Sequence, residues 1–149
     1  MTMTEEKLTV NITQEIHVRA SIEATFEALL EQMGPHNEGG DGSPMPMKLE
    51  AWPGGRWYRD LGGDNGHFWG HVQAIKRPTL MEICGPLFAS HPLVSNVQYR
   101  LKEEDGGTVI YFRHAATGFL PEETKSRVGT GWGTLLERVR KGAENRLAK

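Results

Sequence analysis

Cysteine, long apolar runs and excess charge of either sign are all scarce in this sequence. Cys84 is the single cysteine, which excludes an intrachain disulfide and a zinc site built on cysteines. No run approaches the ~18 apolar residues of a membrane span, and residues 1–7 lack the apolar core of a secretory signal peptide. The net charge of -2 provides no basic surface for nucleic acid or an anionic membrane. We therefore expect a cytoplasmic protein that binds neither.

What remains is the composition of an ordinary globular domain. Hydrophobic residues make up 38% of the chain and charged residues 24%, which favours a folded, soluble class over a disordered one. At 149 residues, the chain is expected to form one domain that spans 1–149.

Residues 121–149 carry the most regular pattern in the sequence. Apolar residues recur there at helical spacing, and charged residues fill the positions between them. The apolar set is Val128, Trp132, Leu135, Leu136, Val139 and Ala143. This pattern predicts a long amphipathic helix whose apolar face is buried against other elements.

Before this helix, most of the chain alternates between apolar and polar residues, which predicts strands separated by turns. The expected strands cover residues 7–19, 47–52, 56–61, 67–76, 79–84, 94–103 and 108–116. A short helix over 22–33 begins at the N-cap Ser21, and a loop or irregular helix covers 36–46. Residues 62–66, which contain Asn65-Gly66, mark a hairpin turn. Because the long helix follows all the strands, it must lie across an antiparallel sheet. The predicted fold class is α+β.

Several short segments resemble one known superfamily in their order along the chain. They are residues 16–29, Pro53-Gly54-Gly55-Arg56-Trp57, residues 70–75 with Pro78 and Leu80, residues 107–114, and Gly131-Trp132. Together they are similar to the START/Bet v 1-like superfamily, also called SRPBCC, and most similar to its bacterial branch related to the activator of Hsp90 ATPase. The chain departs from that family at the glycine-rich stretch 34–46, where members often carry a tryptophan-containing segment.

This resemblance implies a helix-grip fold. In such a fold, a curved seven-stranded antiparallel sheet surrounds the C-terminal helix, and one or two short helices follow the first strand. The interior of relatives often holds an apolar ligand. A few relatives are cyclases, dehydratases or oxygenase subunits, whereas many only bind or carry.

Strand alternation indicates which side chains face the long helix: Val97, Tyr99 and Leu101 on one strand, and Ile110, Phe112 and His114 on the next. They either form core or line a mostly apolar pocket. The candidate ligand-binding residues are Trp57, Phe68, Tyr99, Phe112, His114, Trp132 and Leu136.

Two of these candidates carry polar groups on an apolar face. His114 could exchange a proton near neutral pH, or it could be a core histidine bonded to a backbone carbonyl. The Tyr99 hydroxyl could orient a ligand, or its tip could reach water.

Trp132 is flanked by Gly129, Gly131 and Gly133, each of which costs a helix about 1 kcal/mol relative to alanine. Either a strand or a ligand approaches the helix closely there, or the helix starts near Gly131 and the glycines lie in a frayed first turn.

Other polar residues are weaker candidates. His67, Trp69 and His71 are expected to share one strand face, with Phe68 and Val72 turned inward. The outward face could be a homodimer surface; no third ligand accompanies the two histidines, so we expect neither a metal nor another cofactor. Glu82 would be a general-base candidate only if it faced inward.

Three functions remain open after these observations. The first is a domain that binds an apolar or amphipathic small molecule without catalysis. The second, which the resemblance implies, is a chaperone-associated interaction module. The third is a cyclase-like or hydrolase-like enzyme that uses His114 or Glu82 as acid or base and has no catalytic residue that the sequence alone establishes.

Overall fold

The computed structural model describes residues 9–88 and 90–146. The elements in chain order are β1 (Thr9–Val18), α1 (Ile22–Met33), β2 (Lys48–Leu49), β3 (Arg56–Gly62), β4 (Asn65–Lys76), β5 (Leu80–Gly85), β6 (Leu93–Glu104), β7 (Gly107–Gly118) and α2 (Glu122–Arg146). The predicted arrangement is confirmed, with a seven-stranded antiparallel sheet, a short helix after the first strand and a long closing helix.

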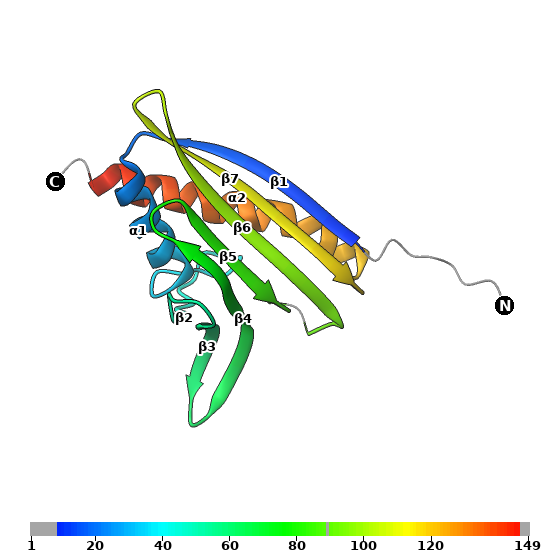
Figure 1. The fold of residues 1–149 in the computed structure, drawn as a ribbon. Helices are drawn as coiled ribbons and strands as arrows, with labels where there is room; N and C mark the ends of the chain where they lie inside the picture. The colour runs from blue at the N-terminus through cyan, green and yellow to red at the C-terminus, as the bar shows by residue number, and fades with distance from the viewer. Residues whose placement is uncertain (1–8, 89, 147–149) are drawn as a thin grey trace.

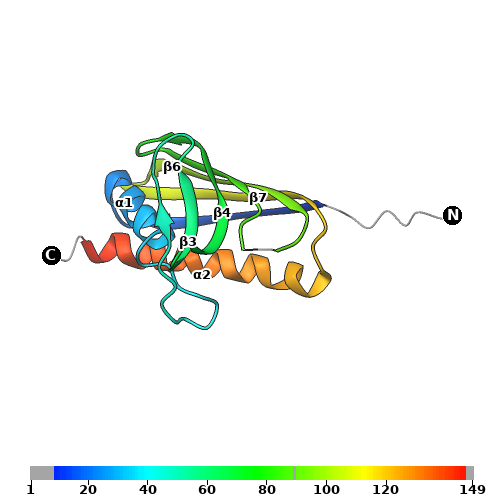
Figure 2. The same cartoon turned by 90° about the horizontal axis from the view of Figure 1, so that it is seen from below.

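The sheet forms one layer and α2 the other. The strand order is β1-β7-β6-β5-β4-β3-β2, so the first and last long strands pair and the β3–β4 hairpin lies toward the far edge. Figure 1 shows the curved sheet crossing α2, with the β3–β4 hairpin extending beyond the other strands. Figure 2 shows α2 along one face of the sheet and α1 at one end. The core lies between these two layers.

Helix α2 is amphipathic, as its spacing predicts. Its six predicted apolar residues are all buried, whereas Arg140 on another side of the helix pairs with Glu137 and Glu144. The helix begins one residue later than expected, and positions 147–149 lie outside the described residues. Within the part of the chain described here, no helix is long and apolar enough to cross a membrane.

Both ends of α1 are held by side chains. The Ser21 hydroxyl accepts a hydrogen bond from the Ala24 amide, as an N-cap should. At the other end, the carbonyl of Met33 accepts a hydrogen bond of 2.7 Å from the indole Nε1 of Trp57. The last carbonyls of a helix have no partner inside the helix, so Trp57 both satisfies α1 and joins it to β3.

Two predictions near β3 are wrong in detail. The strand expected over 47–52 covers only Lys48–Leu49, because the chain turns back at Glu50, whose carboxylate binds the amide and guanidinium of Arg56. The β3–β4 turn lies within the predicted stretch 62–66, but its centre is Gly63 and Asp64, both with positive φ, and Asn65-Gly66 begins β4.

A β-bulge at Trp69 changes which side chains of β4 face α2. Trp57 pairs with Gly70 and Tyr58 pairs with Phe68, so Trp69 has no partner on β3. The bulge fits because position 70 is glycine: a Cβ there would lie 2.7 Å from the carbonyl oxygen of Cys84. The alternation predicted for this strand is therefore interrupted.

The orientation predicted for Phe68 is wrong as a result of this bulge. Phe68 is 41% exposed and its ring packs against His71 on the outer face of the sheet. His67 and Trp69 turn instead toward α2, so His67, Trp69 and His71 do not form one outward face. The outward face from which a homodimer surface was expected therefore does not form, and homodimerisation itself stays a prediction.

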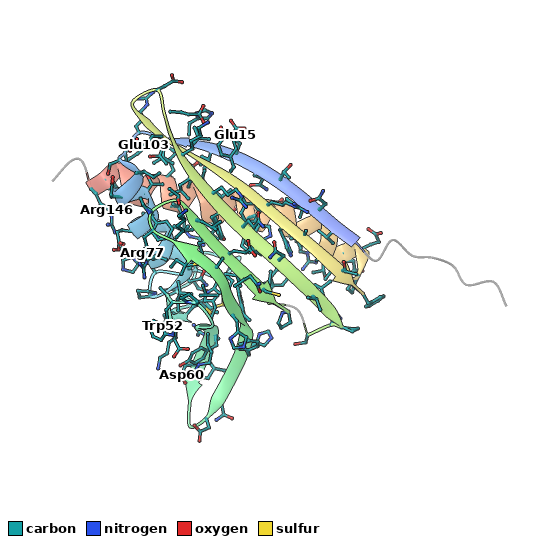
Figure 3. The ribbon with its side chains drawn as sticks, viewed as in Figure 1. Glu15, Trp52, Asp60, Arg77, Glu103 and Arg146 are labelled. Atoms are coloured by element: carbon teal, nitrogen blue, oxygen red, sulfur yellow. The ribbon has the colours of Figure 1, made fainter. Side chains whose placement is uncertain are left out.

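Trp57→Phe should destabilise the protein by about 2 kcal/mol or more, because it leaves the Met33 carbonyl without its partner and opens space in the core. Urea denaturation followed by circular dichroism measures this loss. Trp52→Phe is the matched control, because Trp52 is 58% exposed at the edge of the sheet, near β2 and β3 (Figure 3). Equal stability of the two variants would contradict the role given to Trp57.

Candidate functional site

A pocket of about 540 Å³ opens between α2, the β3–β4 hairpin and the loop that follows α1. The hairpin contributes Trp57, His67 and Trp69, and Phe88 follows β5. The loop contributes Asn37, Glu38, Gly39, Gly40 and Met45, and α2 contributes Thr124, Arg127, Val128, Gly131, Trp132, Leu135 and Arg138. The glycine-rich stretch that departs from the family pattern therefore forms one wall of the pocket.

Aromatic rings dominate the wall that the strands supply. The rings of Trp57 and Trp69 meet edge to face with centroids 5.0 Å apart, and Phe88 meets Trp69 in the same way at 6.1 Å. Such edge-to-face pairs add to the stability that burial alone provides and hold each ring in one orientation. The pocket thus has a rigid aromatic wall rather than a flexible aliphatic one.

Each indole N–H in the pocket is already used by the protein. Trp57 donates to the Met33 carbonyl, Trp69 donates to Nδ1 of His67 at 3.2 Å, and Trp132 donates to Nδ1 of His114 at 3.0 Å. Since an indole has only this one donor, the three tryptophans can offer a ligand their rings and no hydrogen bond.

His114 joins α2 to two strands of the sheet. Its Nδ1 accepts from the Trp132 indole, so in the neutral ring Nε2 carries the proton and donates to the Ser95 hydroxyl at 2.9 Å. Burial lowers the pKa of His114 to about 4, because an imidazolium loses its hydration there. His114 is a satisfied core histidine at neutral pH, bonded to side chains rather than to the expected backbone carbonyl.

The three glycines around Trp132 lie inside α2, which begins at Glu122; the interpretation of a frayed first turn is wrong. Gly131 lines the pocket, and a Cβ there would meet nothing within 4 Å. Gly133 faces β1, where a Cβ would lie 3.4 Å from Oε1 of Gln14. Gly129 also faces open space but does not line the pocket.

The rim of the pocket is polar. Arg138 lies 3.5 Å from the carboxylate of Glu38 and donates to the Gln32 side chain, so the loop and α2 are joined by an ion pair beside the opening. Asn37 is buried, and its Nδ2 donates to the Met45 carbonyl. Because a carbonyl can only accept a hydrogen bond, the nitrogen of the Asn37 side-chain amide must point toward Met45.

Tyr99 is fully buried, and among the described residues nothing bonds its hydroxyl. Burial raises the pKa of this phenol, so it stays protonated. Its ring packs on Phe112, which packs on Trp132 with centroids 4.9 Å apart. Tyr99 therefore lies two rings behind the pocket wall rather than on it.

A second hollow of about 860 Å³ lies where the β1–α1 connection, the β6–β7 turn and the last part of α2 meet. Charged and small residues form most of its lining, and its Arg140 is engaged by Glu137 and Glu144. Apart from His17, none of the described residues that line it is aromatic. It is the larger hollow, but it lacks the apolar wall of a small-molecule site.

Most of the sequence matches the model of one protein family. The sequence model of the family described as "Activator of Hsp90 ATPase homolog 1-like protein" (AHSA1) matches residues 19–143. The chain belongs to the AHSA1 family. No curated protein matches its sequence.

Solved structures resemble the AHSA1-like chain at low sequence identity. A protein from Rhizobium leguminosarum is 18% identical with a TM-score of 0.69, over 92% of this chain and 95% of that one. Ara h 8.0201 is 13% identical with a TM-score of 0.66, over 95% and 99%. The di-domain ARO/CYC StfQ from the steffimycin biosynthetic pathway is 13% identical with a TM-score of 0.67, over 95% of this chain and 53% of that one. These likenesses show that the chain shares the helix-grip fold of Ara h 8.0201.

The predicted site residues of this AHSA1-like chain separate into three groups. Trp57 and Trp132 line the pocket. Tyr99, Phe112, His114 and Leu136 are buried in the core, where Phe112 and His114 support the Trp132 ring from behind. Phe68 lies on the outer face. Ligand binding by these seven residues stays a prediction.

Sequence reasoning missed His67, Trp69, Phe88, Asn37 and Arg138 as pocket residues. The signal that could have found the first two is Gly70, because an isolated glycine inside a strand pattern indicates a bulge. The alternation of apolar and polar residues does not indicate the other three. Phe88 and Asn37 lie in loops, and Arg138 lies at the edge of the apolar face of α2.

The remaining polar candidates lie away from the pocket. Glu82 faces outward and accepts hydrogen bonds from Asn96 and Gln98, so its carboxylate is not the inward general base considered from the sequence. His71 donates from Nδ1 to the Gly54 carbonyl on the outer face. Among the described residues, no three His, Cys, Asp or Glu side chains are grouped as metal ligands.

The pH dependence of stability should report on His114. With a pKa of 6.5 when unfolded and about 4 when folded, His114 takes up a proton more readily in the unfolded chain. The contribution of His114 to the free energy of unfolding is complete above pH 6.5. It is lost as the pH falls toward 4, by roughly 3 kcal/mol in total. His114→Gln cannot lose this contribution. The difference in free energy of unfolding between the wild type and His114→Gln should therefore narrow as the pH falls.

Urea denaturation of wild type and His114→Gln at several pH values measures this difference. The pH effects of the carboxylates drop out of it, because both proteins carry the same carboxylates. His17→Gln serves as the control because its side chain is 71% exposed, and it should follow the wild-type curve. A gap that stays constant between pH 7 and 4 would show that His114 is not held neutral.

Tyr99→Phe should leave stability unchanged or raise it by about 1 kcal/mol, because it removes a buried donor that lacks a partner. Thermal and urea denaturation measure the change. In Tyr111→Phe, the matched variant, a hydroxyl that donates to Glu104 is lost, so a gain is not expected there. A clear loss of stability in Tyr99→Phe would mean that its hydroxyl has a partner after all.

Proposed function

We propose that this protein binds an apolar or amphipathic small molecule in the pocket beside Trp132, without chemical conversion. The observation that carries the proposal is the pocket itself: an aromatic wall faces a helix whose side chain is missing at Gly131. Its volume of about 540 Å³ lies within the range of known ligand sites, which is roughly 300–1,000 Å³.

The helix glycine at position 131 gives secondary support to a ligand, because it lines the pocket. Glycine in the interior of a helix costs about 1 kcal/mol relative to alanine, and a Cβ at position 131 would meet no neighbour. Packing within the described residues therefore does not require glycine there. Space for a ligand against the helix backbone is a sufficient reason for it.

The polar groups near the pocket favour binding over catalysis. His114 is engaged at both ring nitrogens and is screened from the pocket by Trp132. Glu38 and Arg138 are paired with each other. General acid–base catalysis needs a titratable group within hydrogen-bond reach of the substrate. His114, Glu38 and Arg138 are committed to structural bonds, and only Nε2 of His67 is left without a bond to a described residue on the strand side of the pocket.

Gly131→Leu should weaken binding of the fluorescent apolar probe 1-anilinonaphthalene-8-sulfonate, because position 131 lines the pocket and a leucine would take up space there. The same change should not reduce stability, since leucine favours a helix over glycine by roughly 0.5–1 kcal/mol. Fluorescence titration measures affinity, and urea denaturation measures stability.

Gly129→Leu is the matched control, because it makes the same change two residues away, outside the pocket. It should bind the probe as the wild type does. If Gly131→Leu binds the probe as tightly as Gly129→Leu, the pocket is not the binding site. Native mass spectrometry of gently purified wild type and of both variants searches directly for a co-purifying natural ligand, which the proposal expects to be missing only from Gly131→Leu.

A further inference from the structure

His67 is a hydrogen-bonding group that the bulge places in the pocket. The extra residue at Trp69 turns both His67 and Trp69 toward α2, whereas His71 on the same strand faces outward. His67 is half-buried and lines the same pocket as Trp57, Phe88 and Trp132. Its position follows from the backbone of β4, which Gly70 allows to approach β5.

Trp69 determines which nitrogen of His67 carries the proton. The Trp69 indole donates to Nδ1 at 3.2 Å, and an indole N–H can only donate. Nδ1 is therefore the bare nitrogen of a neutral ring, and the proton is on Nε2. No described residue forms a hydrogen bond with this Nε2, which leaves one oriented side-chain donor on the strand side of the pocket lining.

The two other indole donors and Arg138 are committed elsewhere, and Arg127 and Thr124 lie on the α2 side of the pocket. The indoles of Trp57 and Trp132 donate to Met33 and His114, and Arg138 is held between Glu38 and Gln32. A ligand in contact with the strand side of the pocket therefore meets flat aromatic faces and edges together with a single N–H. An aromatic ligand would be stabilised both by burial and by ring–ring contacts with this wall. An alkyl chain would be stabilised by burial alone.

On the basis of the proposed function, we infer that the ligand is a planar aromatic molecule carrying an acceptor oxygen, and that His67 Nε2–H donates to that oxygen. His67 then determines specificity, and Trp69 is the positioning residue that holds its tautomer. The acceptor can be a carboxylate or a carbonyl, since each accepts from a neutral imidazole N–H.

Isothermal titration calorimetry with 2-naphthoate and decanoate at neutral pH tests the inference, because both are carboxylates of similar carbon number and only one is planar. The wild type should bind 2-naphthoate about tenfold more tightly than decanoate. His67→Phe, which keeps a ring but loses the donor, should weaken 2-naphthoate binding by about tenfold. Titration with 2-acetonaphthone distinguishes a carbonyl acceptor from a carboxylate.

Two variants make the test specific for the donor. His67→Gln keeps an acceptor for Trp69 and an N–H for the ligand, so it should recover most of the affinity lost in His67→Phe. His71→Phe makes the same change on the outer face and should bind as the wild type does. Nitrogen NMR of the His67 ring should show the Nε2–H tautomer in the wild type and a mixture in Trp69→Phe.

The outcomes separate this inference from the proposed function. Decanoate binding as tightly as 2-naphthoate, or His67→Phe binding unchanged, would overturn the inference while leaving a pocket that takes apolar molecules. If neither carboxylate nor 1-anilinonaphthalene-8-sulfonate bound the wild type, both would fall. A wild-type His67 ring in the Nδ1–H form would contradict the role given to Trp69.

Discussion

The hydrogen bond from the Trp132 indole to His114 is the constraint on which the rest of the site depends. It fixes α2 to β7 at one point, and the His114–Ser95 bond extends that attachment to β6. The Trp132 ring is then held against Phe112 and becomes one wall of the pocket. Burial makes this attachment conditional on a neutral imidazole, because protonation of Nδ1 would set two donors against each other.

Much of the fold and part of the site were predictable from local pattern. Alternation in β6 and β7 correctly turned Tyr99, Phe112 and His114 toward the helix, since a regular strand has a period of two. Helical spacing likewise placed Trp132 on the buried face of α2. The order of the elements was sufficient for the architecture because a helix that follows all the strands has one sheet face to cover.

The remaining part of the site depends on departures from regular geometry. One extra residue at Trp69 reverses the alternation, which exchanges Phe68 for His67 and Trp69 in the pocket. Whether His114 is a proton donor or a core residue depends on partners far away in the chain, Ser95 and Trp132. Loops after α1 and β5 supply further walls, and their shape follows from individual turns rather than from a period.

The central claim is that three tryptophans with engaged N–H groups form the binding wall, and that the fourth, Trp52, does not take part. The most direct measurement is the indole NMR spectrum of the protein during titration with an apolar aromatic probe. Ring signals of Trp57, Trp69 and Trp132 should shift together, while their N–H protons stay protected from exchange and Trp52 stays unchanged. Shifts confined to Trp52, or no shift at saturating probe, would contradict the account.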